Sequence, residues 1–233
     1  MSFKKRIIKQ HKSWTPTKLA QYEECPAKAM YKHIDKLPEP PSPALDRGTE
    51  IHDAAANYIT RRKPGLHDAL HGKKTKKQLA LLQKEYKAKK VRVELELAFT
   101  KEWKPCHWLA KDVYVRFKID VVHFLKAGRV RVIDWKTGKF KPNEEYNDQL
   151  EAYQLALLVS GLAKEVESTL WFTDSDDVVD SEDVYTLKDL PALKAKWEKR
   201  AKPMLSDTKH APRPGKGCWF CPFSTNKGGP CEF

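Results

Sequence analysis

The sequence predicts a mixed α/β fold in which helices flank a central sheet, and three observations favour it. Two segments rich in Val, Ile, Phe and Tyr, VYVRFKIDVVHF and VRVIDWKTG, predict a β-hairpin over residues 113–138. Segments with helical spacing and capping residues precede this hairpin, and an amphipathic segment follows it from residue 147. Cysteines gather near the C-terminus, so we expect an N-terminal helical segment, a sheet-containing core and a cysteine-rich tail.

The composition indicates a folded protein with a polyanionic partner. The 233 residues include 40% hydrophobic residues and seven Trp, which fits one domain. Within that domain we expect a basic arm at 1–12, a core at 13–211 and a cysteine module at 212–233. The net charge of +13 favours nucleic acid first and a membrane surface second, with solubility alone as the alternative.

Membrane and secretion signals are not expected. The sequence has no run of 18 apolar residues that would predict a transmembrane span. Its start, MSFKKRIIKQHK, lacks the apolar region of a signal peptide. We therefore expect a cytoplasmic protein whose cysteines are thiols or metal ligands rather than disulfides.

The N-terminal segment predicts two short helices. Thr15 followed by Pro16 is a favourable start, with Thr as the N-cap and Pro at the first helical position. The Cys25-Pro26 pair interrupts the pattern, so a second helix is expected after it. The proline-rich residues 37–43 predict a stiff linker.

A longer helix is expected after this linker. Asp46 can cap it, and Ile51, Ala55 and Ile59 fall on one apolar stripe. His52 lies at the edge of that stripe. A partly buried, hydrogen-bonded imidazole is the ordinary interpretation of such a residue, and a metal ligand is the alternative.

A basic segment and a first strand come next. Residues 61–77 are rich in Lys and Arg and either contact phosphates or form a solvated surface. Residues 76–89 predict a helix. The alternating segment VRVELELAF, at 91–99, predicts a strand with Glu94 and Glu96 on one face.

The hairpin carries the candidate site. With Gly128 in the turn and the turn centred near Ala127, residues whose numbers sum to 254 face each other, which places Asp120 opposite Asp134. Because strand side chains alternate, Lys136 shares the face of Asp134. Paired carboxylates suit Mg²⁺ or Mn²⁺, and a neighbouring lysine can position water or stabilise phosphate charge. The alternative is a pair of edge-strand charges with a salt-bridging lysine.

The residues after the hairpin predict a helix over 147–161 that ends at Ser160-Gly161. Gln149 and Tyr153 lie four residues apart on it, and therefore one turn apart on the same face. They form a functional pair, or, as the alternative, the tyrosine packs in the core and the glutamine is exposed on the surface.

The remaining core predicts two strands and a helix. The segments VESTLWFT and EDVYTL, at 166–173 and 182–187, have strand composition. The acidic segment between them, 174–183, is expected to be a turn because it lacks the glycine and spacing of a calcium loop. Residues 188–200 predict a helix.

Four cysteines form a candidate metal site. Cys218 and Cys221 make a C-x-x-C pair, Cys231 follows after nine residues, and Cys25 is the fourth candidate, whereas Cys106 has no partner spacing. By spacing, tetrahedral Zn²⁺ and a [4Fe–4S] cluster are both open, with a redox C-x-x-C as a third option.

Several of these motifs together resemble the PD-(D/E)XK nuclease superfamily. An Asp on one strand, Asp120, followed by Asp134-x-Lys136 on the next, looks like its core motif, and VIDWKTGK is similar to the RecB-like branch. That branch includes phage exonucleases and CRISPR adaptation nucleases. The segment RGTEIHDAA around His52 and the Q-x-x-x-Y motif of Gln149 and Tyr153 resemble further motifs of the same branch.

The resemblance implies a restriction-endonuclease-like nuclease core and hydrolysis of DNA phosphodiester bonds, as an exonuclease in replication, recombination or repair. His52, Asp120 and Asp134 would hold Mg²⁺ or Mn²⁺ with a main-chain carbonyl near Trp135, and Lys136 would activate water. Gln149 and Tyr153 would flank the active site and touch DNA, and a glutamate of the first strand would lie near the metal. Expected partners are DNA and recombination or replication proteins, with no membrane.

The cysteine arrangement resembles that of RecB-like nucleases with an iron–sulfur cluster, because one cysteine precedes the core and three follow it. The resemblance implies that Cys25, Cys218, Cys221 and Cys231 hold [4Fe–4S], with Zn²⁺ as the alternative. Pro26, Trp219, Phe220 and Pro222 are expected to shield the sulfurs. Two other functions stay open: a catalytically silent DNA-binding module pinned by this metal site, and a site-specific endonuclease of the restriction type.

Overall fold

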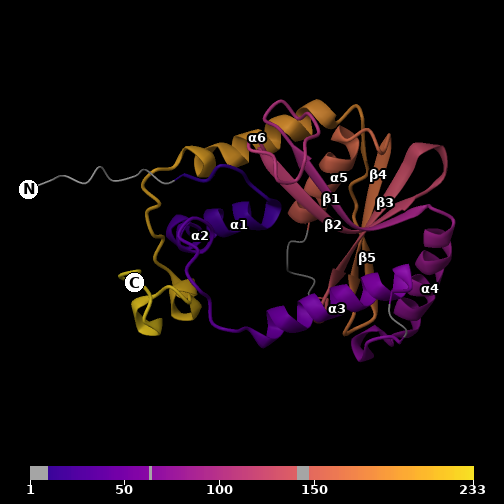
Figure 1. Cartoon of the computed structure of the whole chain (residues 1–233), viewed down its shortest axis with the longest axis horizontal. Coiled ribbons are helices and arrows are strands. Elements are labelled where there is room, and N and C mark those ends of the chain that lie inside the picture. Colours follow the sequence, from indigo (N-terminus) through magenta and orange to yellow (C-terminus); the bar gives the residue numbers. More distant parts are fainter. Residues whose placement is uncertain (1–9, 63–64, 141–146) are drawn as a thin grey trace, which may run out of the picture. The chain divides into compact units, whose positions relative to one another are not determined.

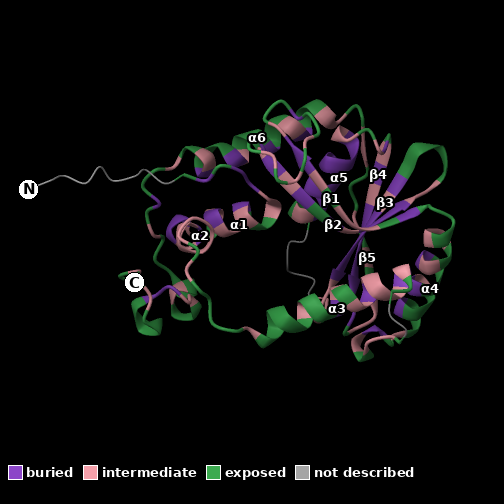
Figure 2. Cartoon of the chain, in the orientation of Figure 1, coloured by how far each residue is buried: buried purple, intermediate pink, exposed green. Residues whose placement is uncertain are grey.

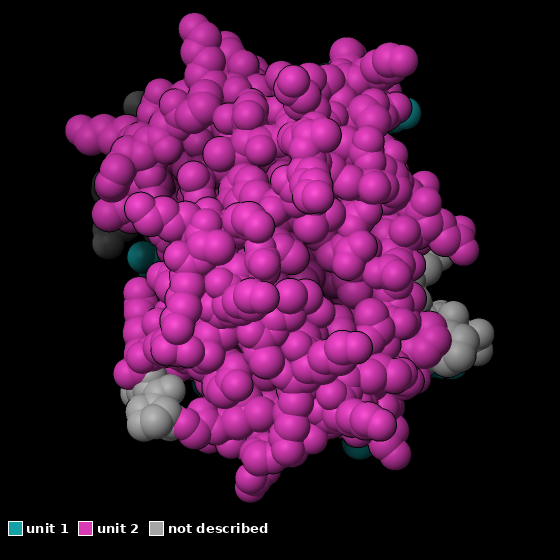
Figure 3. All heavy atoms as spheres, turned by 90° about the vertical axis from the view of Figure 1, so that its right-hand side faces the viewer, with its two compact units in different colours: residues 1–41, 195–233 teal, residues 42–194 magenta. Residues whose placement is uncertain are grey.

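The computed structural model describes residues 10–62, 65–140 and 147–233. Two compact units make up the chain (Figure 1): residues 42–194 form one, and residues 1–41 with 195–233 form the other. Figure 3 shows one face of the unit of residues 42–194. The unit that contains the sheet is therefore continuous in sequence, and the two segments of the other unit flank it.

A six-stranded mixed sheet organises the unit of residues 42–194, in the order β1-β2-β3-β4-β5 with β6 also paired to β4. The strands are β1 (Val91–Phe99), β2 (Val115–Phe124), β3 (Arg129–Lys136), β4 (Glu165–Phe172), β5 (Asp177–Asp180) and β6 (Tyr185–Thr186). Of the pairs among these six strands, β3 with β4 is parallel and the others are antiparallel. Parallel neighbours need a crossover, which the helix α5 (Asn147–Val159) supplies. This confirms the predicted mixed α/β fold with helices around a central sheet.

Helices cover both faces of the sheet. On one face, α3 (Pro43–Thr60) packs through the predicted stripe, Ile51, Ala55 and Ile59, onto strand residues that include Trp171. The helix α4 (Lys73–Lys87) joins the same cluster through Leu79 and Leu82. On the other face, Leu150 of α5 packs against Leu170 and Phe172. The alternation along β4 thus separates two apolar layers, and the strands and inward helix faces are the buried parts of this unit (Figure 2).

The β2–β3 hairpin has the predicted register. Its pairs run from Val121↔Ile133 to Phe124↔Val130, and the two numbers in each pair sum to 254. The turn is a short 3-10 helix, η2 (Lys126–Gly128), with positive φ at Ala127 (58°) and Gly128 (79°). Glycine adopts this conformation without penalty, which fixes the turn and hence the register. Asp120 and Asp134 lie one residue beyond the last pair.

The helices α1 (Pro16–Glu24) and α3 each begin at a proline that follows an N-cap residue. Thr15 is the N-cap of α1, and its side chain accepts a hydrogen bond from the Lys18 amide at 3.1 Å, as predicted. The prediction that Asp46 caps α3 is wrong, because the helix begins at Pro43 after the N-cap Ser42. Pro43 has the φ that the first helical position needs, and Asp46 then lies in the first turn, where its charge favours the helix dipole.

Two further expectations need correction. The acidic segment 174–183 is not only a turn, because Val178 and Val179 pair with β4 and form β5. The last helix, α6 (Leu190–Ser206), extends beyond residue 200 and contains Pro203. Burial explains the extension, since Trp197, Ala201 and Met204 continue one apolar stripe with helical spacing.

The unit of residues 1–41 and 195–233 combines α1, α2 (Pro26–His33) and the C-terminal part of α6 with two 3-10 helices, η3 (Lys216–Phe220) and η4 (Thr225–Lys227). Trp14 stacks on Trp197 with ring centroids 5.5 Å apart, and both are buried. Arg200 lies over the Trp197 ring and ion-pairs with Glu23 at 2.8 Å. These contacts join the first helix to the last, although 177 residues separate Glu23 from Arg200.

Some expectations concern residues that lie outside the described part of the chain. They are most of the basic arm (1–9), two residues of the basic segment (63–64) and most of the loop after the hairpin (141–146). His11, which follows soon after residues 1–9 in the sequence, is buried. In the remaining chain, every helix falls short of the length and apolarity that a membrane crossing requires.

Candidate active site

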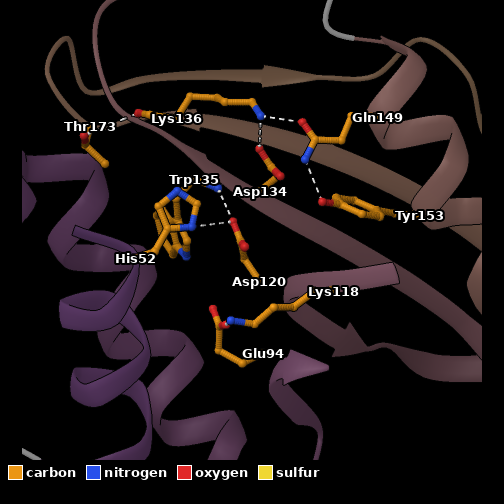
Figure 4. Close-up of polar contacts among 10 residues, drawn as sticks. All are labelled: His52, Glu94, Lys118, Asp120, Asp134, Trp135, Lys136, Gln149, Tyr153 and Thr173. Carbon is orange, nitrogen blue, oxygen red and sulfur yellow. Dashed lines mark hydrogen bonds and ion pairs between the residues drawn. The ribbon is translucent and has the colours of Figure 1, made fainter. Parts of the chain in front are cut away.

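The two aspartates of the hairpin meet at the end of the β2–β3 ladder (Figure 4). The Asp120 Oδ2 accepts a hydrogen bond from the backbone amide of Trp135 at 3.0 Å, which ties the two strands together beyond their last pair. The neighbouring Asp134 is 2% exposed. The predicted juxtaposition of these carboxylates is therefore present, with Asp120 held by a backbone amide and Asp134 buried.

His52 reaches the same place from α3. Its Nδ1 lies 3.1 Å from the Asp120 Oδ2, across 68 residues of sequence. The apolar stripe of Ile51 and Ala55 holds α3 against the sheet, and His52 beside that stripe is directed toward the strand ends. The sequence-based expectation that this helix brings an imidazole to the aspartates agrees with this geometry.

Lys136 connects Asp134 to α5. The Lys136 Nζ lies 2.8 Å from the Asp134 Oδ2 and donates a hydrogen bond to the Gln149 Oε1 at 2.7 Å. The Gln149 Nε2 in turn donates to the Tyr153 hydroxyl at 2.6 Å. The i,i+4 spacing on α5 places the amide and the phenol on one face, so the predicted Gln149–Tyr153 pair forms a chain of contacts that ends on Lys136.

Burial dominates the electrostatics of the site. It raises the pKa of Asp134 to about 6, an effect that Lys136 opposes and Asp120 reinforces. Burial alone would lower the pKa of His52, but the hydrogen bond that His52 donates to Asp120 and the charges of both aspartates outweigh it, so this pKa is raised. Burial, followed by the charges of Asp134 and Asp120, raises the pKa of Tyr153. Burial thus penalises a second carboxylate charge beside Asp120, and a bound cation would relieve this penalty.

The chemistry of the donor set fits a hard divalent cation. The Asp134 Oδ2 is buried, and its contact is with the Lys136 ammonium at 2.8 Å. A second carboxylate and an imidazole lie next to it, and these ligand types suit Mg²⁺ and Mn²⁺. Within residues 10–62, 65–140 and 147–233, no three His, Cys, Asp or Glu side chains are already drawn together as a ligand set.

Glu94 and Lys118 complete the site: the sequence left open which of Glu94 and Glu96 lies near it, and no motif selected Lys118. Glu94 of β1 falls opposite Asp120 in the β1–β2 register, between the pairs Val93↔Val121 and Leu95↔Ile119, and it ion-pairs with Lys118 of β2. Together with His52 and Asp120, both side chains line a cavity of about 390 Å³ that Glu96 does not line. Strand alternation gave a signal for Lys118, because it precedes Asp120 by two residues and therefore shares its face.

The four candidate cysteine ligands line one cavity of about 320 Å³ in the unit of residues 1–41 and 195–233. Backbone amides lie 3.4 Å from two of the sulfurs, Arg213 N from Cys25 Sγ and Gly215 N from Cys218 Sγ. The cysteines remain free thiols, and no metal-binding group is assembled among the described residues. Cys106 is not among the residues that line this cavity.

The expected shielding of the sulfurs is only partly correct. Pro26 is buried and Pro222 is half-buried, but Trp219 and Phe220 are 70% and 81% exposed. The short 3-10 helix η3 turns these two side chains outward. The aromatic residue that packs here is instead Phe223, which is buried with its ring 5.6 Å from that of Tyr31.

Comparisons with known proteins agree with this architecture. The crystal structure of SSO0001 is similar to this chain with a TM-score of 0.50 and 16% sequence identity, over 94% of this chain and 86% of that one. At this identity the likeness supports the fold alone. A comparison with curated proteins gives no match. The family model described as the PD-(D/E)XK nuclease superfamily matches residues 13–225, and the chain therefore belongs to that superfamily.

Proposed function

We propose that this protein is a divalent-metal-dependent deoxyribonuclease of the RecB-like branch, and that it acts as an exonuclease in DNA replication, recombination or repair. The observation that carries the proposal is the meeting of Asp120, Asp134 and Lys136 at one end of a strand ladder, with His52 3.1 Å from Asp120. A surface ion pair does not explain why the Asp134 carboxylate is buried beside a second carboxylate.

The side chains divide the work of hydrolysis. Asp120, Asp134 and His52 would hold Mg²⁺ or Mn²⁺, which supplies acidity to a water molecule and stabilises the departing oxygen. Lys136 places a positive charge beside the reacting phosphate and orients the attacking water. The hydrogen bond to Gln149 holds the Lys136 ammonium in place, and the Trp135 amide holds Asp120, so both groups keep their positions without substrate.

The distribution of charge supports a polyanionic substrate. Residues 1–41 and 195–233 contain 17 Lys and Arg against 7 Asp and Glu, a net charge of +10. Residues 42–194 contain 27 against 24, a net charge of +3. Most of the excess charge thus belongs to the smaller unit, which we propose contributes much of the sequence-independent attraction to DNA phosphates.

We further propose that Cys25, Cys218, Cys221 and Cys231 hold a [4Fe–4S] cluster, with Zn²⁺ as the alternative. Their common cavity and the amides close to Cys25 and Cys218 support a thiolate-bound group, since backbone N–H groups stabilise charged sulfur. Anaerobically purified protein should be brown, and Cys25→Ser should bleach it. Colourless protein with one equivalent of zinc would overturn the cluster and retain the site.

The central test is cleavage of end-labelled linear and circular DNA with and without Mn²⁺. We expect Asp134→Ala and Lys136→Ala to abolish cleavage while the thermal unfolding midpoint stays near that of the wild type. Lys126→Ala, in the exposed turn of the same hairpin, is the matched control and should remain active. Full activity of either active-site variant, or activity in excess chelator, would refute the proposal. Binding of DNA without any cleavage would favour the silent DNA-binding module instead.

A further inference from the structure

The ion pair between Lys118 and Glu94, at the margin of the candidate active site, joins residues that the strand register does not place opposite each other. Lys118 of β2 stands directly opposite Glu96 of β1, yet its ammonium pairs with Glu94, the residue opposite Asp120. The ammonium therefore leans diagonally across the ladder toward the aspartates. In Figure 4 this pair lies beside Asp120, on the side away from Asp134.

The backbone of Glu94 is also unusual. Its φ is 52°, in the left-handed region, although pairs on both sides of it continue the antiparallel ladder without a change of register. This conformation is unfavourable for a residue with a side chain, and an exposed ion pair returns little free energy in compensation. Strained backbone of this kind concentrates at functional sites. The conformation directs Glu94 into the cavity that it shares with His52 and Asp120.

Lys118 differs from Lys136 in its freedom to move. Lys136 is engaged by Asp134 and Gln149, and only 26% of its side chain is exposed. Lys118 has 55% of its side chain exposed at the same cavity, whereas Glu94 has 28%. A lysine ammonium on a flexible stem is a mobile point charge that binds phosphate well.

We propose that Lys118 is a phosphate-positioning residue, and that a divalent cation competes with it for Glu94. Without the cation, the ammonium neutralises Glu94. When a cation binds at the carboxylates, Glu94 turns toward it, and Lys118 is released to hold a phosphate of the DNA next to the scissile bond. This inference rests on the proposed nuclease function and adds a second lysine with a separate task.

The exchange predicts effects of opposite sign on Mn²⁺ affinity, together with a loss of DNA affinity in Lys118→Met that a merely structural ion pair does not produce. If the pair were only structural, removing either partner would lower stability similarly and would leave DNA affinity in Ca²⁺ unchanged. If the Lys118 ammonium and the divalent cation compete for Glu94, then Glu94→Gln removes a group that attracts the divalent cation. Lys118→Met removes the ammonium that competes with that cation. The two variants should therefore move Mn²⁺ affinity in opposite directions.

The test is Mn²⁺ titration by calorimetry, together with DNA binding in Ca²⁺ measured by fluorescence anisotropy of a labelled duplex. We expect Glu94→Gln to weaken Mn²⁺ binding by about 5-fold or more and Lys118→Met to strengthen it by about 2-fold or more, as expected for loss or gain of one nearby charge. Lys118→Met should also weaken DNA binding by about 10-fold and reduce the salt slope by about one. Lys118→Arg should restore most of the DNA affinity, and Lys126→Met should change neither quantity.

The outcomes separate this inference from the proposed function. Weaker or unchanged Mn²⁺ binding in Lys118→Met, or unchanged DNA affinity, would overturn the role of Lys118 even if Asp134→Ala abolished Mn²⁺ binding. If Asp134→Ala bound Mn²⁺ as well as the wild type, the proposed metal site itself would fail, and the exchange with it. Thermal unfolding of each variant checks that the fold is retained. We expect little change for the Lys118 variants, because 55% of that side chain is exposed to solvent.

Discussion

The contact between Gln149 and Lys136 gives a graded prediction about activity. The Gln149 Oε1 accepts a hydrogen bond from the Lys136 ammonium at 2.7 Å. A hydrogen bond to a charged group contributes about 1.5–3 kcal/mol, which corresponds to about 10- to 150-fold in rate if it is fully expressed in the transition state. About a quarter of the Lys136 side chain is exposed, so water replaces part of the lost contact. For Gln149→Ala we therefore expect the lower part of that range, about 10- to 50-fold.

Tyr153 should matter less, because its hydroxyl contacts the amide of Gln149 and not the lysine. Losing this neutral hydrogen bond costs about 0.5–1.5 kcal/mol, so Tyr153→Phe should slow cleavage by about 2- to 12-fold. Gln149→Glu keeps an acceptor for Lys136 and should be faster than Gln149→Ala. The ordering of the three variants follows from the direction of the hydrogen-bond chain.

The assay is single-turnover cleavage of end-labelled linear duplex in Mn²⁺, across a range of DNA concentrations. Since Gln149 acts through Lys136, the loss should fall mainly on the cleavage rate, with little change in the DNA concentration at half-saturation. Gln83→Ala is the matched control, because it removes an amide hydrogen bond to the Tyr58 carbonyl, between α3 and α4. A Gln149→Ala variant with wild-type rate, or a Tyr153→Phe variant slower than Gln149→Ala, would refute the reasoning.

Three other predictions concern stability and binding. Gly229→Ala should destabilise the cysteine-rich tail, because an added Cβ would lie 2.3 Å from the backbone of Phe223. Limited proteolysis measures this effect, and a tail that is cleaved no faster in the variant than in the wild type would contradict the prediction. Burial, and then Lys18, lowers the pKa of His11 to about 4, and burial lowers that of His33 to about 4. Because the unfolded imidazoles take up protons near pH 6.5, stability should fall as the pH drops from about 6.5 to 4, and chemical denaturation of the His11→Asn, His33→Asn double variant should show a flatter slope. The net charge of +13 predicts DNA affinity that falls steeply between about 50 and 200 mM salt, and flat binding across that range would reject it.

Local sequence was sufficient where short-range geometry decides the outcome. The turn at Ala127 and Gly128 fixes which residues of the hairpin oppose each other, so the positions of Asp120 and Asp134 followed from counting. Helical periodicity likewise placed Gln149 one turn before Tyr153.

Tertiary contacts decided what spacing could not reveal. No sequence rule sends the ammonium of Lys118 diagonally to Glu94 rather than straight across to Glu96, because that choice depends on the backbone of Glu94 and the charges around it. The extension of α6 depends on the burial of Met204. The strand β5 forms because it can pair with β4, which lies beside it in the sheet.

What the sequence by itself determined is thus the set of reactive side chains, the register of the hairpin and the alternation of helices and strands. The resemblance to a nuclease family, and not local sequence, led us to expect His52 beside Asp120 and a common site for the four cysteines. Only the tertiary structure decided that Lys136 is held by Gln149 and that Lys118 pairs with Glu94. The physical reason is that such contacts join residues far apart in sequence, so they form only after burial of apolar surface has overcome the entropy of closing long loops.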